Sequence, residues 1–174
     1  MKIGLTGTVS IGKTTLVKAL ADLPQFKDYY ISTERSKYLR DLGIPLNTDS
    51  ILPGQFVFLA ERASELLRGD LLTDRTVWDV CAFTLSSKSI NWREKKIFVE
   101  AATTMTEYYD IIIYVDPEGV EIEDNGVREV NSEYRDKINK VIKELLEEYK
   151  PKKLIRVKGT TEERIAIILS ELGL

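Results

Sequence analysis

A glycine-rich loop near the start of the chain constrains the fold more than any other feature. Residues 7–14 read GTVSIGKT, which is the Gly-x4-Gly-Lys-Thr spacing of a phosphate-binding P-loop. An apolar run of strand length, Lys2–Thr6, precedes the loop, and residues 15–21 have the composition of a helix. The backbone N–H groups of such a loop point into one concavity, to which the helix adds its positive N-terminal end. The sequence therefore predicts a polyphosphate site between the first strand and the first helix.

The residues of this loop have distinct predicted roles. Gly7 and Gly12 permit backbone conformations and a close approach that a Cβ would obstruct. Lys13 is expected to bridge the β- and γ-phosphates, and the Thr14 hydroxyl is expected to ligate Mg²⁺. The residues predicted to contact the nucleotide are Gly7, Ser10, Ile11, Gly12, Lys13, Thr14 and Thr15.

The composition excludes several kinds of chemistry. The chain has no histidine, so carboxylates, lysines and arginines must carry any catalysis. Cys81 is the only cysteine, so an intrachain disulfide is impossible and an intracellular, cytoplasmic setting is expected. The net charge of −3 argues mildly against a protein that coats a polyanion. No apolar run reaches membrane-spanning length, so we expect neither a signal peptide nor a membrane partner.

Strands and helices are predicted to alternate along the whole chain. Further strands are expected at residues 28–33, 70–73, 110–115 and 153–157. Helices are expected at residues 34–42, 55–68, 77–85, 92–109, 132–149 and from 161 onward. Residues 47–54 and 116–131 are interpreted as loops, the second of them mobile. The pattern predicts one α/β domain over residues 1–174, with a parallel sheet of about five strands, helices on both faces and a lid at about 117–136.

Charged side chains follow the predicted strands at their carboxyl ends, where such sheets bind ligands. Glu34 follows the second strand, Asp74 and Arg75 follow the third, and Asp116 follows the fourth. A short apolar strand that ends in an acid is the Walker B arrangement, so Asp74 is expected to hold Mg²⁺ together with Thr14. Asp116 precedes a proline and is interpreted as a turn residue.

These motifs resemble the P-loop nucleoside and nucleotide kinases, whose third strand ends in an Asp/Glu-Arg-Ser/Thr/Tyr triplet, here residues 74–76. Residues 58–63, FLAERA, are similar to the helix of thymidylate kinases whose arginine holds the acceptor's phosphate. Residues 74–83, DRTVWDVCAF, resemble more closely the AAA-type nucleoside kinases that include ribosylnicotinamide kinase domains. That family also carries a glutamate after the second strand, matched by Glu34, and an acidic-Gly-hydrophobic-Arg lid, matched by residues 124–128.

The resemblance implies an ATP- and Mg²⁺-dependent kinase that transfers the γ-phosphate to a nucleoside or (deoxy)nucleoside monophosphate. Glu34 would be the base near the acceptor hydroxyl, and Lys37 could neutralise an anion in the same pocket. Arg62 is either the acceptor-phosphate ligand or a solvated helix residue. Arg128 and Arg135 either close over the transferred group or form surface salt bridges with neighbouring acids. The implied catalytic set is Lys13, Glu34, Asp74, Arg75, Arg128 and Arg135.

The acceptor pocket is expected to use aromatic faces for a base, although such residues are more often plain core. The candidates are Tyr30, Phe56, Trp78 and Phe83. The adenine of the donor would lie against the turn after the last strand, at residues 158–160. Cys81, inside an apolar helix, is interpreted as a buried packing residue.

Two other functions remain open. The chain could phosphorylate a hydroxyl of DNA or RNA, at a 5′ end or a hydroxymethylated base, although its acidic charge speaks against a nucleic-acid partner. It could also be a P-loop ATPase or GTPase switch, but Asn-Lys-x-Asp is missing after the fourth strand and no separate helical domain is present. The helix at residues 92–109 could pack against a second subunit in a homodimer.

Overall fold

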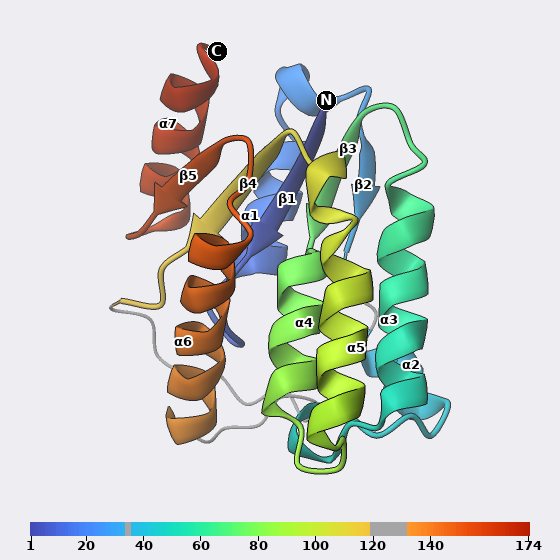
Figure 1. The fold of residues 1–174 in the computed structure, drawn as a ribbon. Helices are drawn as coiled ribbons and strands as arrows, with labels where there is room; N and C mark the ends of the chain where they lie inside the picture. The colour runs from blue at the N-terminus through green and yellow to red at the C-terminus, as the bar shows by residue number, and fades with distance from the viewer. Residues whose placement is uncertain (34–35, 119–131) are drawn as a thin grey trace.

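The computed structural model describes residues 1–33, 36–118 and 132–174. Its strands are all parallel and form one sheet in the order β2-β3-β1-β4-β5 (Figure 1). They are β1 (Lys2–Thr6), β2 (Tyr30–Ser32), β3 (Leu71–Asp74), β4 (Ile111–Val115) and β5 (Leu154–Val157). The predicted parallel α/β sheet of about five strands is therefore confirmed.

Helices cover both faces of this sheet (Figure 1). One face is covered by α1 (Lys13–Ala21) and α7 (Thr161–Leu172). The other is covered by α3 (Leu52–Glu65), α4 (Val77–Ser86), α5 (Trp92–Thr103) and α6 (Ser132–Glu148). The short α2 (Ser36–Asp41) and three 3₁₀ helices, Pro24–Phe26, Asn47–Asp49 and Thr106–Tyr108, complete the described elements. No helix in the described ranges has both the length and the apolarity needed to cross a bilayer.

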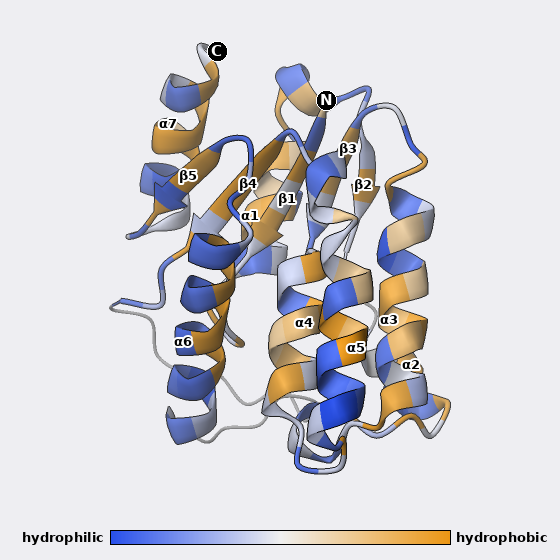
Figure 2. Cartoon of the chain, in the orientation of Figure 1, coloured by the Kyte–Doolittle hydropathy of each residue, from blue (hydrophilic) through white to orange (hydrophobic). Residues whose placement is uncertain are grey.

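The interior strand β4, between β1 and β5, shows why the sheet is buried on both faces. Its sequence, IIIYV, is entirely buried, and successive side chains point to opposite faces. Ile111, Ile113 and Val115 pack in the core under α1 and α7, whereas Ile112 and Tyr114 pack in the core under the other helices. Figure 2 shows the matching pattern, apolar strands between helices whose hydrophilic residues face outward.

Two helices, α3 and α5, have boundaries that differ from the prediction by three residues or more. Helix α3 begins at Leu52 and not at residue 55, because Pro53 is tolerated in the first turn and Gly54 leaves room for Ile44. A Cβ on Gly54 would lie 2.9 Å from Ile44 Cγ2. Helix α5 ends at Thr103 and not at residue 109, and the chain continues into the 3₁₀ helix Thr106–Tyr108. Trp92 and Ile97 of α5 are exposed, and the homodimer expected through this helix stays a prediction.

Gly4 of β1 lets the start of α4 approach the sheet. A Cβ at this position would lie 2.4 Å from Thr76 Cγ2 and 3.0 Å from the Tyr109 ring. Gly4→Ala is therefore expected to lower the free energy of unfolding by about 2 kcal/mol, measured by urea denaturation. Gly69→Ala is the control, because nothing lies within 4 Å of the added Cβ, and it should change stability by less than about 0.5 kcal/mol. Equal stability of the two variants would contradict the packing described for Gly4.

Candidate active site

The loop after β1 lies at the point in the sheet where the strand order reverses, because β2 and β3 lie on one side of β1 and β4 and β5 lie on the other. β1 lies between β3 and β4, and ligands of open parallel sheets bind at the carboxyl ends of the strands beside such a switch point. Asp74, the last residue of β3, is level with Leu5, so it lies beside the start of the loop at residues 7–14. The two predicted halves of the phosphate site therefore share one edge of the sheet.

The backbone of this loop needs both of its glycines. Gly7 has φ 144°, and a Cβ there would lie 2.7 Å from the carbonyl oxygen of Val115. Gly12 has φ 79° and is the N-cap of α1, where it offers no side chain to the first turn. The first N–H groups of α1 therefore remain available for an anion, as predicted from the spacing. Ser10 also has a positive φ, of 56°, and its strain lies within the same loop.

Lys13, Thr14 and Asp74 meet at the mouth of the loop. Lys13 Nζ donates hydrogen bonds to the carbonyl oxygens of Gly7, at 2.7 Å, and of Thr8, at 2.5 Å. The Thr14 hydroxyl donates to a carboxylate oxygen of Asp74, which is buried. Hydroxyl and carboxylate oxygens are the donors that Mg²⁺ prefers, so this pair fits the ion. The described residues contain no group of three or more His, Cys, Asp or Glu side chains that could hold a metal ion.

Asp79 of α4 is a functional residue that the sequence analysis missed. Its Oδ1 accepts from the Gly7 N–H and from Arg75 Nη1, each at 3.4 Å. Its Oδ2 accepts from the N–H and the hydroxyl of Thr76, each at 2.8 Å, and closes a capping box. The Thr-x-x-Asp spacing is a sequence signal for that cap, but it does not reveal the contact with the P-loop. One buried carboxylate thus joins the phosphate loop to the arginine after β3.

Arg75 is held in a conformation that non-glycine residues rarely adopt. Its φ is 113°, its N–H donates to the Leu5 carbonyl at 3.1 Å, and its guanidinium lies 4.9 Å from the centre of the Phe83 ring. Such strain persists only where neighbours determine the geometry, here Asp79 and Phe83. Phe83, one of the aromatic candidates, therefore lies beside Arg75.

Arg62 is only 3% exposed, so the interpretation as a solvated helix residue is wrong. Its Nη2 donates to Glu65 Oε1 at 2.5 Å. Glu65 also accepts from the Ser32 hydroxyl at 2.6 Å and from the Thr73 hydroxyl at 2.9 Å. This buried network ties α3 to the ends of β2 and β3, next to Asp74. The sequence analysis missed Glu65, Ser32 and Thr73, which have no motif signal.

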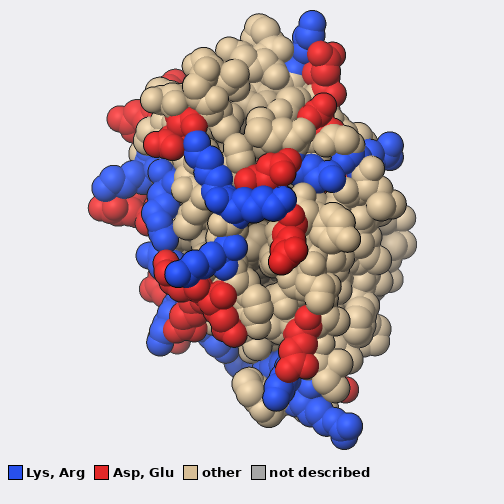
Figure 3. Space-filling view, turned by 45° about the horizontal axis from the view of Figure 1, so that its top comes forward, with Lys and Arg blue, Asp and Glu red and all other residues tan. Residues whose placement is uncertain are grey.

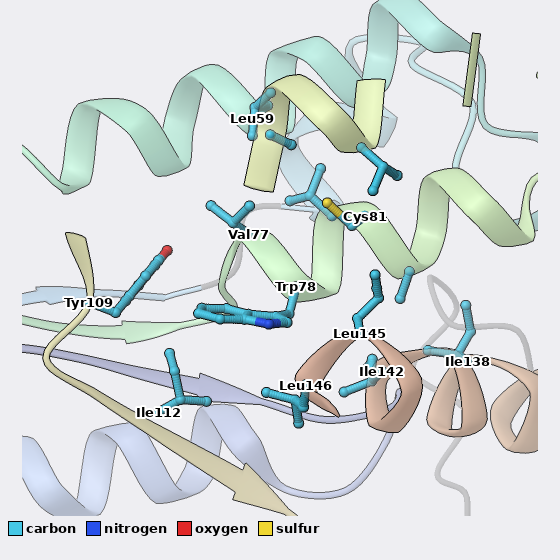
Figure 4. Packing of buried hydrophobic residues seen from close by; sticks show 14 of the residues in the cluster. Leu59, Val77, Trp78, Cys81, Tyr109, Ile112, Ile138, Ile142, Leu145 and Leu146 are labelled. Atoms are coloured by element: carbon cyan, nitrogen blue, oxygen red, sulfur yellow. The ribbon is translucent and has the colours of Figure 1, made fainter. Parts of the chain in front are cut away.

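Three aromatic candidates lie away from the site. Trp78 is 1% exposed, packs against Tyr109 and donates its indole N–H to the Tyr149 carbonyl, within the core shown in Figure 4. Phe56 is 47% exposed and packs edge-on against Phe98 of α5, about 120° around α3 from Arg62. Tyr30 begins β2 at the amino end of the sheet, under the guanidinium of Arg68. The predicted roles of Trp78, Phe56 and Tyr30 as platforms for a base are corrected accordingly.

Arg135 of α6 lies close to the phosphate loop. Its backbone carbonyl accepts from the Thr8 hydroxyl at 2.7 Å, and its Nη2 donates to the Pro117 carbonyl at 3.2 Å. Arg135 is buried, and the two roles predicted for it stay predictions. Asp116 accepts from the Glu118 N–H at 3.0 Å, as expected of a turn residue. Glu34, Arg128 and the side chain of Lys37 lie outside what the structure describes.

Cys81 is a packing residue, as predicted. It is buried against Leu59 and its neighbours in α4 (Figure 4). Burial, with a smaller contribution from the negative charge of Asp79, raises the pKa of its thiol to about 12. A thiol that stays protonated at neutral pH is a poor nucleophile, so Cys81 takes no part in the chemistry.

Comparison with known protein families assigns the chain to a family. A family model described as an AAA domain matches residues 2–164. The chain belongs to this AAA-domain family. The resemblance of residues 74–83 to the AAA-type family is therefore confirmed. A search of curated proteins found no match to the chain.

Solved structures of similar fold include two kinases and NadR. The deoxyadenosine kinase from M. mycoides with dCMP and dCDP bound has a TM-score of 0.66 and 18% identity, and the match covers 99% of each chain. The thymidylate kinase from Ehrlichia chaffeensis has a TM-score of 0.63 and 13% identity, covering 99% of this chain and 97% of that one. NadR in complex with NR has a TM-score of 0.77 and 17% identity, but only 51% of its own length is covered. At these identities the likeness shows the fold.

The buried Arg62–Glu65 pair leads to a stability prediction. Arg62→Leu leaves the Glu65 carboxylate buried without its cation and should cost about 3 kcal/mol of unfolding free energy. Adding Glu65→Gln should restore about 1 kcal/mol or more, because a neutral amide needs no counter-charge, and it can accept from one of the Ser32 and Thr73 hydroxyls and donate to the other. Urea denaturation of the single and double variants measures both effects.

The exposed pair Lys96–Glu100 on α5 is the matched control for this test. Lys96→Ala should change stability by less than about 0.5 kcal/mol. If Arg62→Leu has an equally small effect, Glu65 does not depend on Arg62 for its charge balance.

Proposed function

We propose that the protein is an ATP- and Mg²⁺-dependent kinase that transfers the γ-phosphate to a nucleoside or (deoxy)nucleoside monophosphate. The observation that carries the proposal is the contact between the Thr14 hydroxyl, at the start of α1, and the Asp74 carboxylate, at the end of β3. A phosphate loop alone binds nucleotides, whereas this pair adds the oxygen donors that phosphoryl transfer requires.

On the donor side, the N–H groups of residues 8–15 would surround the β- and γ-phosphates, and Lys13 Nζ would move from its loop carbonyls onto phosphate oxygens. Thr14 and Asp74 would hold Mg²⁺, which neutralises charge on the phosphates when bound. Arg75, oriented by Asp79, would contact a donor or acceptor phosphate. Arg128 and Arg135 belong to the proposed lid, about residues 117–136, and would stabilise charge on the transferred group.

On the acceptor side, Glu34 would take the proton of the attacking hydroxyl. The hydroxyl oxygen forms a bond to the γ-phosphorus while the bond to the β–γ bridging oxygen breaks, and ADP leaves. Lys37 and Arg62 would hold an anionic part of the acceptor. Arg62 can do so only if the acceptor's phosphate competes with Glu65 for its guanidinium.

A small-molecule acceptor is favoured over a polynucleotide by the acidic net charge of −3. In the face shown in Figure 3, lysines and arginines lie among aspartates and glutamates. Exposed ion pairs such as Arg156–Glu147 and Lys153–Glu171 neutralise cations of the described surface. Polynucleotide binding depends on uncompensated cations along the backbone path. Nucleotides are also the molecules bound in the similar deoxyadenosine kinase.

Transfer of labelled phosphate from ATP to a panel of nucleosides, nucleoside monophosphates and oligonucleotides tests the proposed function. Label is expected on a nucleoside or monophosphate, and Lys13→Ala should lower turnover at least about a hundredfold because a cation on the transferred phosphoryl group is lost. Lys18→Ala, an exposed lysine of the same helix, is the matched control and should leave turnover unchanged. Label found only as free phosphate, or only on oligonucleotides, would overturn the proposal.

The role proposed for Glu34 has its own test. Glu34→Gln should lower kcat by about a hundredfold or more, because the amide cannot take the hydroxyl proton, while the affinity for ATP stays within about twofold. Steady-state kinetics and ATP titration measure the two quantities separately. An unchanged kcat would remove Glu34 as the base.

A further inference from the structure

Helix α7 carries a buried arginine, Arg164, that contacts the phosphate-binding loop at residues 7–14. Arg164 is 3% exposed and lies on the core-facing side of α7 with Ile168. Its Nη1 donates to the carbonyl oxygen of Ile11 at 2.8 Å, and a Cβ on Gly12 would lie 3.3 Å from the same nitrogen. The guanidinium therefore contacts the Ile11–Gly12 peptide of the loop.

This contact fixes the direction of a backbone N–H. The Ile11 carbonyl and the Gly12 N–H belong to one peptide group, which is trans, since the described chain contains no cis peptide bonds. In a planar trans peptide the C=O and N–H point in opposite directions. Because Arg164 holds the Ile11 carbonyl toward α7, the Gly12 N–H must point the other way, toward the concavity of the loop.

The charge of Arg164 is poorly compensated in the described part of the chain. None of the described carboxylates forms an ion pair with it, and its Nε has no hydrogen-bond partner there. Burial lowers the pKa of the guanidinium, and no neighbouring acid offsets this effect. A buried cation in such surroundings gains most from an anion placed nearby.

We propose that Arg164 is a positioning residue of the donor-phosphate site, which orients the Gly12 N–H through the Ile11 carbonyl and adds positive charge behind the loop. The inference rests on the proposed donor site and deepens it, because Arg164 acts through the loop and touches no substrate. It also connects the start of α7, where Arg164 N–H bonds the Thr160 carbonyl at 3.0 Å, to the phosphate loop.

Calorimetric titration of the native protein and of Arg164→Met with ATP and with inorganic tripolyphosphate tests this role. The variant should bind both probes about tenfold more weakly or worse, since it loses the hydrogen bond to Ile11 and the charge. Its midpoint of thermal unfolding without nucleotide should stay equal or rise, because an apolar side chain replaces a buried cation. A purely structural role predicts the reverse, a lower midpoint with unchanged binding.

Arg156→Met is the matched control, because it removes an exposed arginine of the neighbouring strand β5 and should leave both affinities within about twofold. If Arg164→Met does not fold, Arg164→Gln serves in the same titrations and should weaken tripolyphosphate about threefold or more. Affinities within twofold of native in a folded Arg164 variant would overturn the inference. Because these titrations use binding and not turnover, they decide the role of Arg164 even if no acceptor is phosphorylated.

Discussion

The buried carboxylate of Asp79 is the interaction on which the active-site arrangement depends. It accepts hydrogen bonds from the first glycine of the phosphate loop, from Arg75 and from Thr76, so the segments that follow β1 and β3 share one anchor on α4. A buried carboxylate is tolerated only when its oxygens are satisfied, and Asp79 has four donors. The strained φ of Arg75 is stable in this setting, because Asp79 and Phe83 both hold its guanidinium.

The rest of the site is built around this anchor from both faces of the sheet. On one face, the Arg62–Glu65 pair ties α3 to Ser32 and Thr73, which brings the expected acceptor side next to Asp74. On the other face, Arg164 of α7 holds the Ile11 carbonyl. The loop that follows β1 is thus held from the α4 side by Asp79 and from the α7 side by Arg164, while the first N–H groups of α1 remain available for an anion.

The sequence predicted the parts of this site that local spacing determines. The P-loop, Asp74 and the parallel sheet could be predicted because each depends on a short motif or on strand and helix periodicity. Trp78 was misassigned because α4 is apolar on nearly every side, so its sequence does not show which side faces a ligand. Asp79, Glu65 and Arg164 were missed because the partners that tie them to the site, Gly7, Ser32 and Ile11 respectively, lie far away in the chain. Arg164 does occupy the apolar stripe of α7 with Ile168, a signal that periodicity alone could have raised.

A crystal structure with a non-hydrolysable ATP analogue and Mn²⁺ in place of Mg²⁺ tests the central claim most directly. The account predicts the triphosphate within residues 7–15 and an anomalous manganese signal between the Thr14 hydroxyl and the Asp74 carboxylate. Asp79 should still bond the Gly7 N–H, and Arg164 the Ile11 carbonyl. A nucleotide bound elsewhere on the protein, or a metal that contacts neither Thr14 nor Asp74, would contradict the account.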